Sequence, residues 1–132
     1  MIAVDTNVIV RFLVRDDDKQ ADDARRRLKL AEDRRERLRI PLLVVLETIL
    51  VLESAYDKSR AEVLDSIRDM RQMPVFEFEG DRVVEGLLND GPKYKADLAD
   101  ILITHSAETS GCDAGITFDK GAAKLPFFDL LK

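Results

Sequence analysis

The sequence predicts an α/β domain built around a largely parallel sheet. Short apolar segments alternate along the chain with longer segments in which apolar residues recur every three or four positions. Strands that alternate with helices are typical of parallel sheets, because each helix carries the chain back across the sheet. The chain has 132 residues, of which 45% are apolar, so we expect a single domain over residues 1–132.

Five short extended segments are expected. The first, Ile2-Ala3-Val4, is apolar throughout, as is typical of a strand buried on both faces. Arg39-Ile40-Pro41 is extended, because the residue before a proline is disfavoured in a helix. The remaining three segments are Pro74 to Phe78, Gly115 to Phe118, and Phe127-Phe128.

Six helices are expected between and after these segments, over residues 7–13, 17–37, 42–53, 59–70, 81–89 and 96–110. Thr6 and Ser59 are the expected caps of the first and fourth helices. The second is heavily charged, with a narrow apolar stripe. The third is apolar on nearly every side, which predicts a buried helix or one shared with a partner subunit.

The composition excludes several classes of site. With one cysteine, Cys112, and one histidine, His105, the chain has no internal disulfide, cysteine-rich zinc site or two-histidine zinc site. We expect His105 to pack or hydrogen-bond on its helix and Cys112 to be unreactive near a turn. The formal charge of -5 argues mildly against binding nucleic acid by overall charge. With no membrane-length apolar run and no signal segment, the expected location is the cytoplasm.

Two aspartates directly follow predicted strands. Asp5 comes after the first strand and Asp119 after the fourth. Ligands of parallel sheets bind outside the carboxyl ends of the strands, so both residues are candidates for one crevice. The structural alternatives are a helix N-cap for Asp5 and an Asx turn for Asp119.

Three further carboxylates are candidates. Glu47 has mainly apolar neighbours, and a buried carboxylate is costly unless it is paired or binds metal. Asp97 and Asp100 are three residues apart and therefore project from one side of a helix. Asp97 fits a helix cap better, and Asp100 is the better functional candidate.

The convergence of Asp5, Glu47, Asp100 and Asp119 would create strong repulsion, which a divalent cation relieves. Mg²⁺ or Mn²⁺ is expected, because hard cations prefer carboxylate and water ligands. This chemistry suggests metal-dependent hydrolysis of phosphodiesters. The polar residues expected to support the site are Thr6, Asn7 and Thr117.

These residues lie in a pattern that resembles the PIN-domain ribonucleases, and among them the VapC-type toxins of toxin–antitoxin pairs. Four stretches in order along the chain carry the resemblance: 2–13, 40–52, 99–103 and 116–119. The resemblance implies a five-stranded parallel sheet between helices and assigns the metal-binding carboxylates to Asp5, Glu47, Asp100 and Asp119. Asp97 matches an acidic position often found just before the third carboxylate.

The resemblance also implies partners. Such proteins usually form homodimers, cut structured RNA such as transfer or ribosomal RNA, and are neutralised by a small antitoxin whose tail enters the active-site groove. The segment Leu42 to Leu52 suits either a dimer contact or core packing. Because the four main acids are all present, we expect an active enzyme.

The stretch from Lys19 to Arg39 holds nine basic and five acidic residues, a local charge of +4. It could follow an RNA backbone, and the alternative is a solvated helix with alternating ion pairs. The candidate RNA-binding residues are Arg11, Arg15, Arg25 and Arg26, the first two of which could instead contact the antitoxin.

Two other functions remain open from the residues alone. One is a phosphoryl-transfer domain with a strand-end aspartate nucleophile, although Asp5-Thr6-Asn7 lacks the second acid of a D-x-D pair. The other is a binding module that uses the same scaffold to hold RNA without cutting it.

Overall fold

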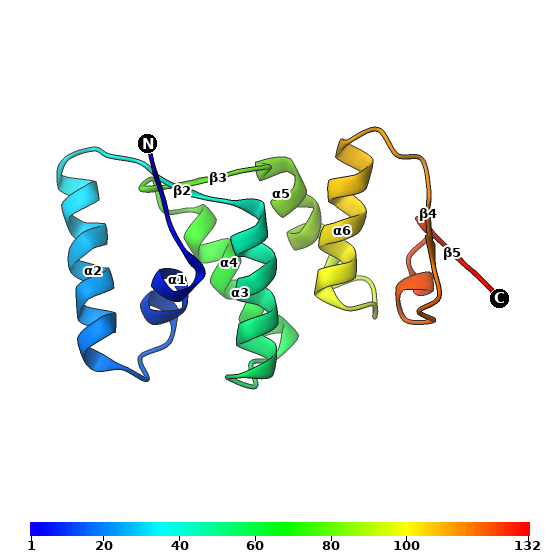
Figure 1. Cartoon of the computed structure of the whole chain (residues 1–132), viewed down its shortest axis with the longest axis horizontal. Coiled ribbons are helices and arrows are strands. Elements are labelled where there is room, and N and C mark those ends of the chain that lie inside the picture. The colour runs from blue at the N-terminus through cyan, green and yellow to red at the C-terminus, as the bar shows by residue number, and fades with distance from the viewer. The chain divides into compact units, whose positions relative to one another are not determined.

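The computed structural model describes all residues, 1–132, and divides into two compact units, Met1–Glu79 and Gly80–Lys132 (Figure 1). The first contains a three-stranded parallel sheet in the order β1-β2-β3, and the second a two-stranded parallel sheet of β4 and β5. The α/β class and the five predicted strands are confirmed. A single five-stranded sheet was expected, but the structure has two parallel sheets, one in each unit.

The strands of the first unit are connected by pairs of helices. Its sheet consists of β1 (Ile2–Ala3), β2 (Leu38–Ile40) and β3 (Phe76–Phe78). In the register of the sheet, Leu38 lies between Ile2 and Phe76. The connecting helices are α1 (Thr6–Leu13), α2 (Asp18–Asp33), α3 (Leu42–Ser54) and α4 (Arg60–Arg71). This alternation is the one that the apolar pattern predicts.

The first strand is exposed, which corrects the prediction of a strand buried on both faces. β1 pairs with β2 on one side only, so it is an edge of its sheet. Ile2 is 44% exposed, and the first buried residue is Val4, directly after the strand. An apolar run indicates burial on both faces only where other elements cover both faces of the sheet.

The charged helix α2 packs through the predicted narrow stripe. Its buried residues are Ala21, Ala24, Leu28 and Ala31. The Asp17 side chain caps the helix by accepting a hydrogen bond from the backbone N–H of Gln20 at 3.0 Å. The helix ends at Asp33, four residues before the predicted boundary, and Arg35 then adopts a left-handed backbone with φ 53°.

The apolar helix α3 has an exposed side, so burial of the whole helix within the chain is wrong, and a helix shared with a partner subunit stays a prediction. Val45, Thr48, Ile49 and Leu52 are buried. Leu43 is 77% exposed, however, and its neighbours on that side of the helix include the exposed Glu47 and Leu50. Contiguous exposed apolar surface is uncommon on monomeric proteins and often marks an interaction site.

The second unit consists of two packed helices and a small sheet. Its elements are α5 (Asp81–Asp90), α6 (Leu98–Thr109), β4 (Gly115–Thr117), the 3₁₀ helix η1 (Ala122–Lys124) and β5 (Phe128–Leu130). Gly115 of β4 is the register partner of Phe128 of β5. Both helices were predicted, with boundaries that differ by one or two residues.

His105 joins the two helices of this unit. Its Nε2 lies 2.6 Å from Oδ2 of Asp90, at the end of α5. Gly86 of α5 makes room for the imidazole, because a Cβ at this position would lie 2.3 Å from Nδ1 of His105. The expected packing role of His105 is present, but its partner is on α5 and not on its own helix.

No helix in the structure combines the length and the apolar character that a membrane crossing requires.

Candidate active site

Three aspartates of the second unit form an acidic cluster. Asp97, Asp100 and Asp119 each place a carboxylate oxygen within 4.8 Å of the other two. Two of them come from the start of α6, and the third comes from the turn that follows β4. The structure thus brings together two of the four predicted principal acids, Asp100 and Asp119, with Asp97 as a third member.

The beginning of α6 positions the first two carboxylates. Asp97 is the N-cap residue, but its side chain makes no capping hydrogen bond, so its carboxylate is not used to cap the helix. Asp100 lies in the first turn, and residues three apart on a helix project from the same side. The sequence spacing therefore already places Asp97 beside Asp100, and it is the signal that identifies Asp97 as a cluster member.

Asp119 is held by the turn that follows β4. Its Oδ1 accepts a hydrogen bond from the backbone N–H of Gly121 at 2.8 Å. Its own backbone N–H donates to Oγ1 of Thr117 at 3.0 Å. The Asx turn, which was the structural alternative for Asp119, is therefore present. It orients the carboxylate, which is at the same time a member of the acidic cluster. Gly121 is a positioning residue that the sequence analysis missed, although the Asp-Lys-Gly turn signals it.

The electrostatics of the cluster are unfavourable to negative charge. The pKa of Asp100 is raised above its ordinary value, chiefly because partial burial disfavours the carboxylate and then because Asp97 and Asp119 are like charges. No basic side chain is among the groups that act on the pKa of Asp100. The cluster is therefore an arrangement that a positive ion would stabilise.

Asp5 and Glu47 lie in the first unit. Asp5 follows Val4, the first residue after β1; it is exposed and occupies the N-cap position of α1 without a side-chain capping bond. Thr6 is the first residue of α1 and is 4% exposed, so the prediction that it caps the helix is wrong. Asn7 is exposed on the first turn. The Asp5 carboxylate is thus free of capping at the end of a parallel strand.

The burial argument for Glu47 is wrong. Its side chain lies on the exposed side of α3, between the buried Val45 and Thr48 in sequence. A helix turns about 100° per residue, so apolar neighbours in sequence need not enclose a side chain. Exposure removes the cost of an unpaired carboxylate, and a role for Glu47 rests on the resemblance alone.

The four candidate RNA-binding arginines have partners within the chain. Arg11 donates to Gln20 at 2.6 Å and, through Nη1, to Asp16 at 2.8 Å and the Tyr56 hydroxyl at 2.9 Å. Arg15 pairs with Asp22, and Arg26 pairs with Asp23. Arg25 donates to the carbonyl of Phe12 and lies over its ring.

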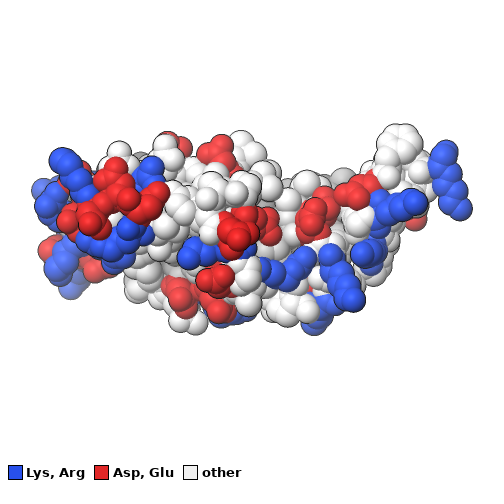
Figure 2. Space-filling view, turned by 90° about the horizontal axis from the view of Figure 1, so that it is seen from below, with Lys and Arg blue, Asp and Glu red and all other residues white.

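The α2 surface mixes charges of both signs, as Figure 2 shows over this helix. Two pairs at i,i+4 spacing, Lys19–Asp23 and Lys29–Asp33, add to those of the arginines. The pattern is that of a solvated helix with alternating ion pairs, which was the alternative to an RNA-tracking surface.

A comparison with protein families identifies the family to which the chain belongs. The PIN domain family matches residues 2–128, which cover most of each unit and include all the candidate acids. The chain belongs to the PIN domain family. PIN domains are generally nucleases, and they typically act on RNA with a divalent metal ion. No curated protein matched the chain.

Family membership fits the acidic cluster. This PIN domain has a nuclease-type fold, and its three clustered carboxylates supply the oxygen ligands that hard divalent cations prefer. The absence of a second histidine or cysteine from the sequence leaves carboxylates as the main donor set.

Proposed function

We propose that this PIN domain is a metal-dependent endoribonuclease that hydrolyses phosphodiester bonds in structured RNA, such as transfer or ribosomal RNA. The observation that carries the proposal is the cluster of Asp97, Asp100 and Asp119, in which the pKa of Asp100 is raised. A carboxyl group whose pKa is shifted by burial and by nearby like charges is typical of functional sites. Membership of a nuclease family supports the same conclusion.

The donor set of the cluster fits Mg²⁺ or Mn²⁺. Three carboxylates with oxygens within 4.8 Å of one another could hold one ion, and Asp5 and Glu47 complete the proposed catalytic set by the family resemblance. When bound, the ion would lower the pKa of water and stabilise charge that develops on the phosphate.

The protein's own residues prepare this site. Asp97 is placed at the N-cap of α6 and Asp100 in its first turn, and Asp119 is held by the N–H of Gly121. Thr117 fixes the backbone of Asp119, which makes it a supporting residue. Groups held on rigid elements need little reorganisation when the substrate binds. Thr6 and Asn7, which follow Asp5 in the sequence, are proposed as polar residues that support Asp5.

The proposed biological role is that of the toxin in a toxin–antitoxin pair in the cytoplasm. Its support is the resemblance of four stretches, from residues 2–13 to 116–119, to VapC-type toxins. The proposed protein partners are a second copy of the chain and a small antitoxin. The exposed apolar residues of α3, among them Leu43 and Leu50, offer surface for such a contact.

The experiment is incubation of the purified protein with total RNA and Mg²⁺ or Mn²⁺, with and without a chelator. We expect discrete fragments that the chelator abolishes, and growth inhibition when the protein is expressed alone. Fragments that persist in the chelator, or intact RNA at every metal concentration, would contradict the proposal. Trapping of a phospho-aspartate at Asp5 would favour the phosphoryl-transfer alternative instead.

A further inference from the structure

Two lysines of the second unit adjoin the acidic cluster along the chain. Lys120 directly follows Asp119, and Lys95 lies two residues before Asp97. Consecutive Cα atoms are about 3.8 Å apart, so the Cα of Lys95 lies within about 7.6 Å of the Cα of Asp97. The backbone therefore holds a cation close to each of two members of the cluster.

Both lysines are exposed and unpaired. Neither side chain takes part in an ion pair or a hydrogen bond within the chain. Neither lysine is among the groups that shift the pKa of Asp100, which is raised by burial and by Asp97 and Asp119. The two ammonium groups therefore do not neutralise the cluster, and both are available to a ligand.

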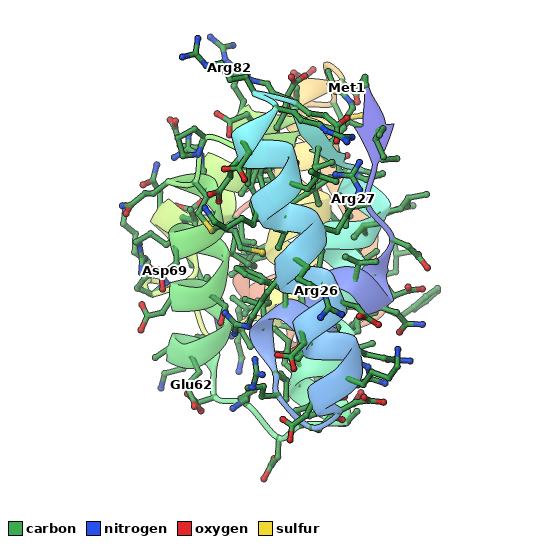
Figure 3. The ribbon with its side chains drawn as sticks, turned by 90° about the vertical axis from the view of Figure 1, so that its left-hand side faces the viewer. Met1, Arg26, Arg27, Glu62, Asp69 and Arg82 are labelled. Carbon is green, nitrogen blue, oxygen red and sulfur yellow. The ribbon has the colours of Figure 1, made fainter.

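The arginines of α2 differ in this respect. Figure 3 looks onto this helix, on which Arg26 and Arg27 are labelled. Arg26 is paired with Asp23, and Arg27 is paired with Glu36. A phosphate bound to either arginine would compete with a carboxylate, whereas a phosphate bound to either of the two lysines displaces no partner. The lysines are therefore the better candidates for contacts with RNA.

An RNA backbone fits this arrangement of charges. A divalent ion held by the acidic cluster would attract the phosphate that is cut. Lysine and arginine side chains are common contacts of the other phosphates, and such contacts fix the position of a strand on a protein. Because RNA carries a phosphate on every nucleotide, one strand can reach the ion and both lysines in succession.

We infer that Lys95 and Lys120 bind backbone phosphates of the RNA next to the bond that is cut. As substrate-binding residues they position the strand at Asp97, Asp100 and Asp119. The inference rests on the proposed function for the nature of the substrate. It places phosphate contacts on the second unit, whereas the sequence pointed to basic residues of the first.

The test is the salt dependence of RNA binding. A fluorescein-labelled oligouridine is titrated with the full chain in chelator, at salt concentrations from about 50 to 200 mM, and binding is followed by fluorescence anisotropy. For a single strand, each phosphate contact contributes about 0.7 to the slope of log K against log salt. Lys95→Gln and Lys120→Gln should each reduce the slope by about 0.7, and the double variant by about 1.4. Lys120→Arg keeps the charge and should keep the wild-type slope.

Arg82→Gln is the matched control within the same unit. Arg82 is exposed and unpaired near the start of α5, and Figure 3 shows its side chain at the upper edge of the molecule. The 10 residues of α5 span about 15 Å, which separates Arg82 from the loop that carries Lys95. Arg26→Gln is the control on α2. Each control removes one exposed cation and should keep the wild-type slope.

Several outcomes would overturn the inference. These are no RNA binding by the wild type at low salt, an unchanged slope in folded Lys95→Gln and Lys120→Gln, or an equal loss of slope in both controls, which would reveal an effect of net charge alone. A loss of slope in one lysine variant only would remove the other lysine from the site. Weaker binding of a polyglutamate peptide by the lysine variants, with RNA binding unchanged, would assign the lysines to a protein partner. Circular dichroism checks that each variant is folded.

The proposed function fails separately from this inference. The expected losses of slope without any metal-dependent cleavage would leave the lysines as phosphate contacts of an RNA-binding module. Metal-dependent cleavage with unchanged slopes would leave the nuclease and remove the two lysines from its substrate site.

Discussion

Asp100 and Asp119 present carboxylate oxygens within 4.8 Å of each other, although one lies in the first turn of α6 and the other follows β4. The pKa of Asp100 is raised, chiefly because of partial burial and then because Asp97 and Asp119 are like charges. Proteins keep such unfavourable pairs where function requires them, at a cost in stability.

The first prediction is that Asp100→Asn stabilises the folded chain near pH 7. Because the folded pKa of Asp100 is raised, the folded state holds the carboxyl proton more tightly than the unfolded state. The unfavourable contribution is therefore present in full above the folded pKa and absent below the unfolded pKa of about 3.9. Thermal unfolding of both proteins across this pH range should show a gain that disappears in acid. A gain that grows toward acid would contradict this account.

A second prediction concerns metal ions and stability. An ion that binds only the folded state stabilises it by about 2.7 kcal/mol when its concentration is 100 times the dissociation constant. Mn²⁺ should therefore raise the unfolding temperature of the wild type and have little effect on Asp100→Asn. Asp113→Asn, an exposed residue before β4, is the matched control and should respond like the wild type. An equal shift in all three proteins would place the ion elsewhere.

The third prediction tests the contact between α5 and α6. Gly86→Ala should destabilise the chain by about 1–3 kcal/mol, because overpacking forces side chains from their positions. The new Cβ would meet the His105 ring and disturb its 2.6 Å contact with Asp90. In a His105→Ala background the same change should cost much less. Equal costs in both backgrounds, measured by urea unfolding, would show that the ring is not what Gly86 accommodates.

Glu47 provides a fourth prediction. Since the side chain is exposed, Glu47→Gln should change the free energy of unfolding by no more than about 0.5 kcal/mol. If Glu47 belongs to the catalytic set, RNA cleavage should nevertheless fall well below that of Glu32→Gln, an exposed control on α2. Cleavage equal to the control would remove Glu47 from the set.

The sequence predicts the elements of this fold better than their burial. Apolar periodicity depends on local geometry, so it locates α4 and α6 to within one or two residues. Burial depends on what covers an element. The apolar run Ile2-Ala3-Val4 therefore misleads, because β1 is an edge strand, and the apolar surroundings of Glu47 in sequence mislead because α3 has an exposed side.

In the candidate site too, the sequence predicts what depends on local geometry and misses what depends on tertiary contacts. Spacing on one helix is enough to place Asp97 beside Asp100, and a strand-end position identifies Asp119. The hydrogen bond from the backbone N–H of Gly121 to Asp119 has no signal in apolar periodicity, because it depends on the turn that follows β4. Contacts set by turns and side-chain conformations are not encoded in apolar periodicity.

The most direct measurement is single-turnover cleavage of a labelled transfer RNA in Mn²⁺ by the wild type, Asp100→Asn and Asp113→Asn. The account predicts that Asp100→Asn is slower by more than about 100-fold, since even residues that only orient metal ligands are worth 10–100-fold. Asp113→Asn should cleave at the wild-type rate. Cleavage by folded Asp100→Asn at the wild-type rate would contradict the assignment of the acidic cluster as the active site.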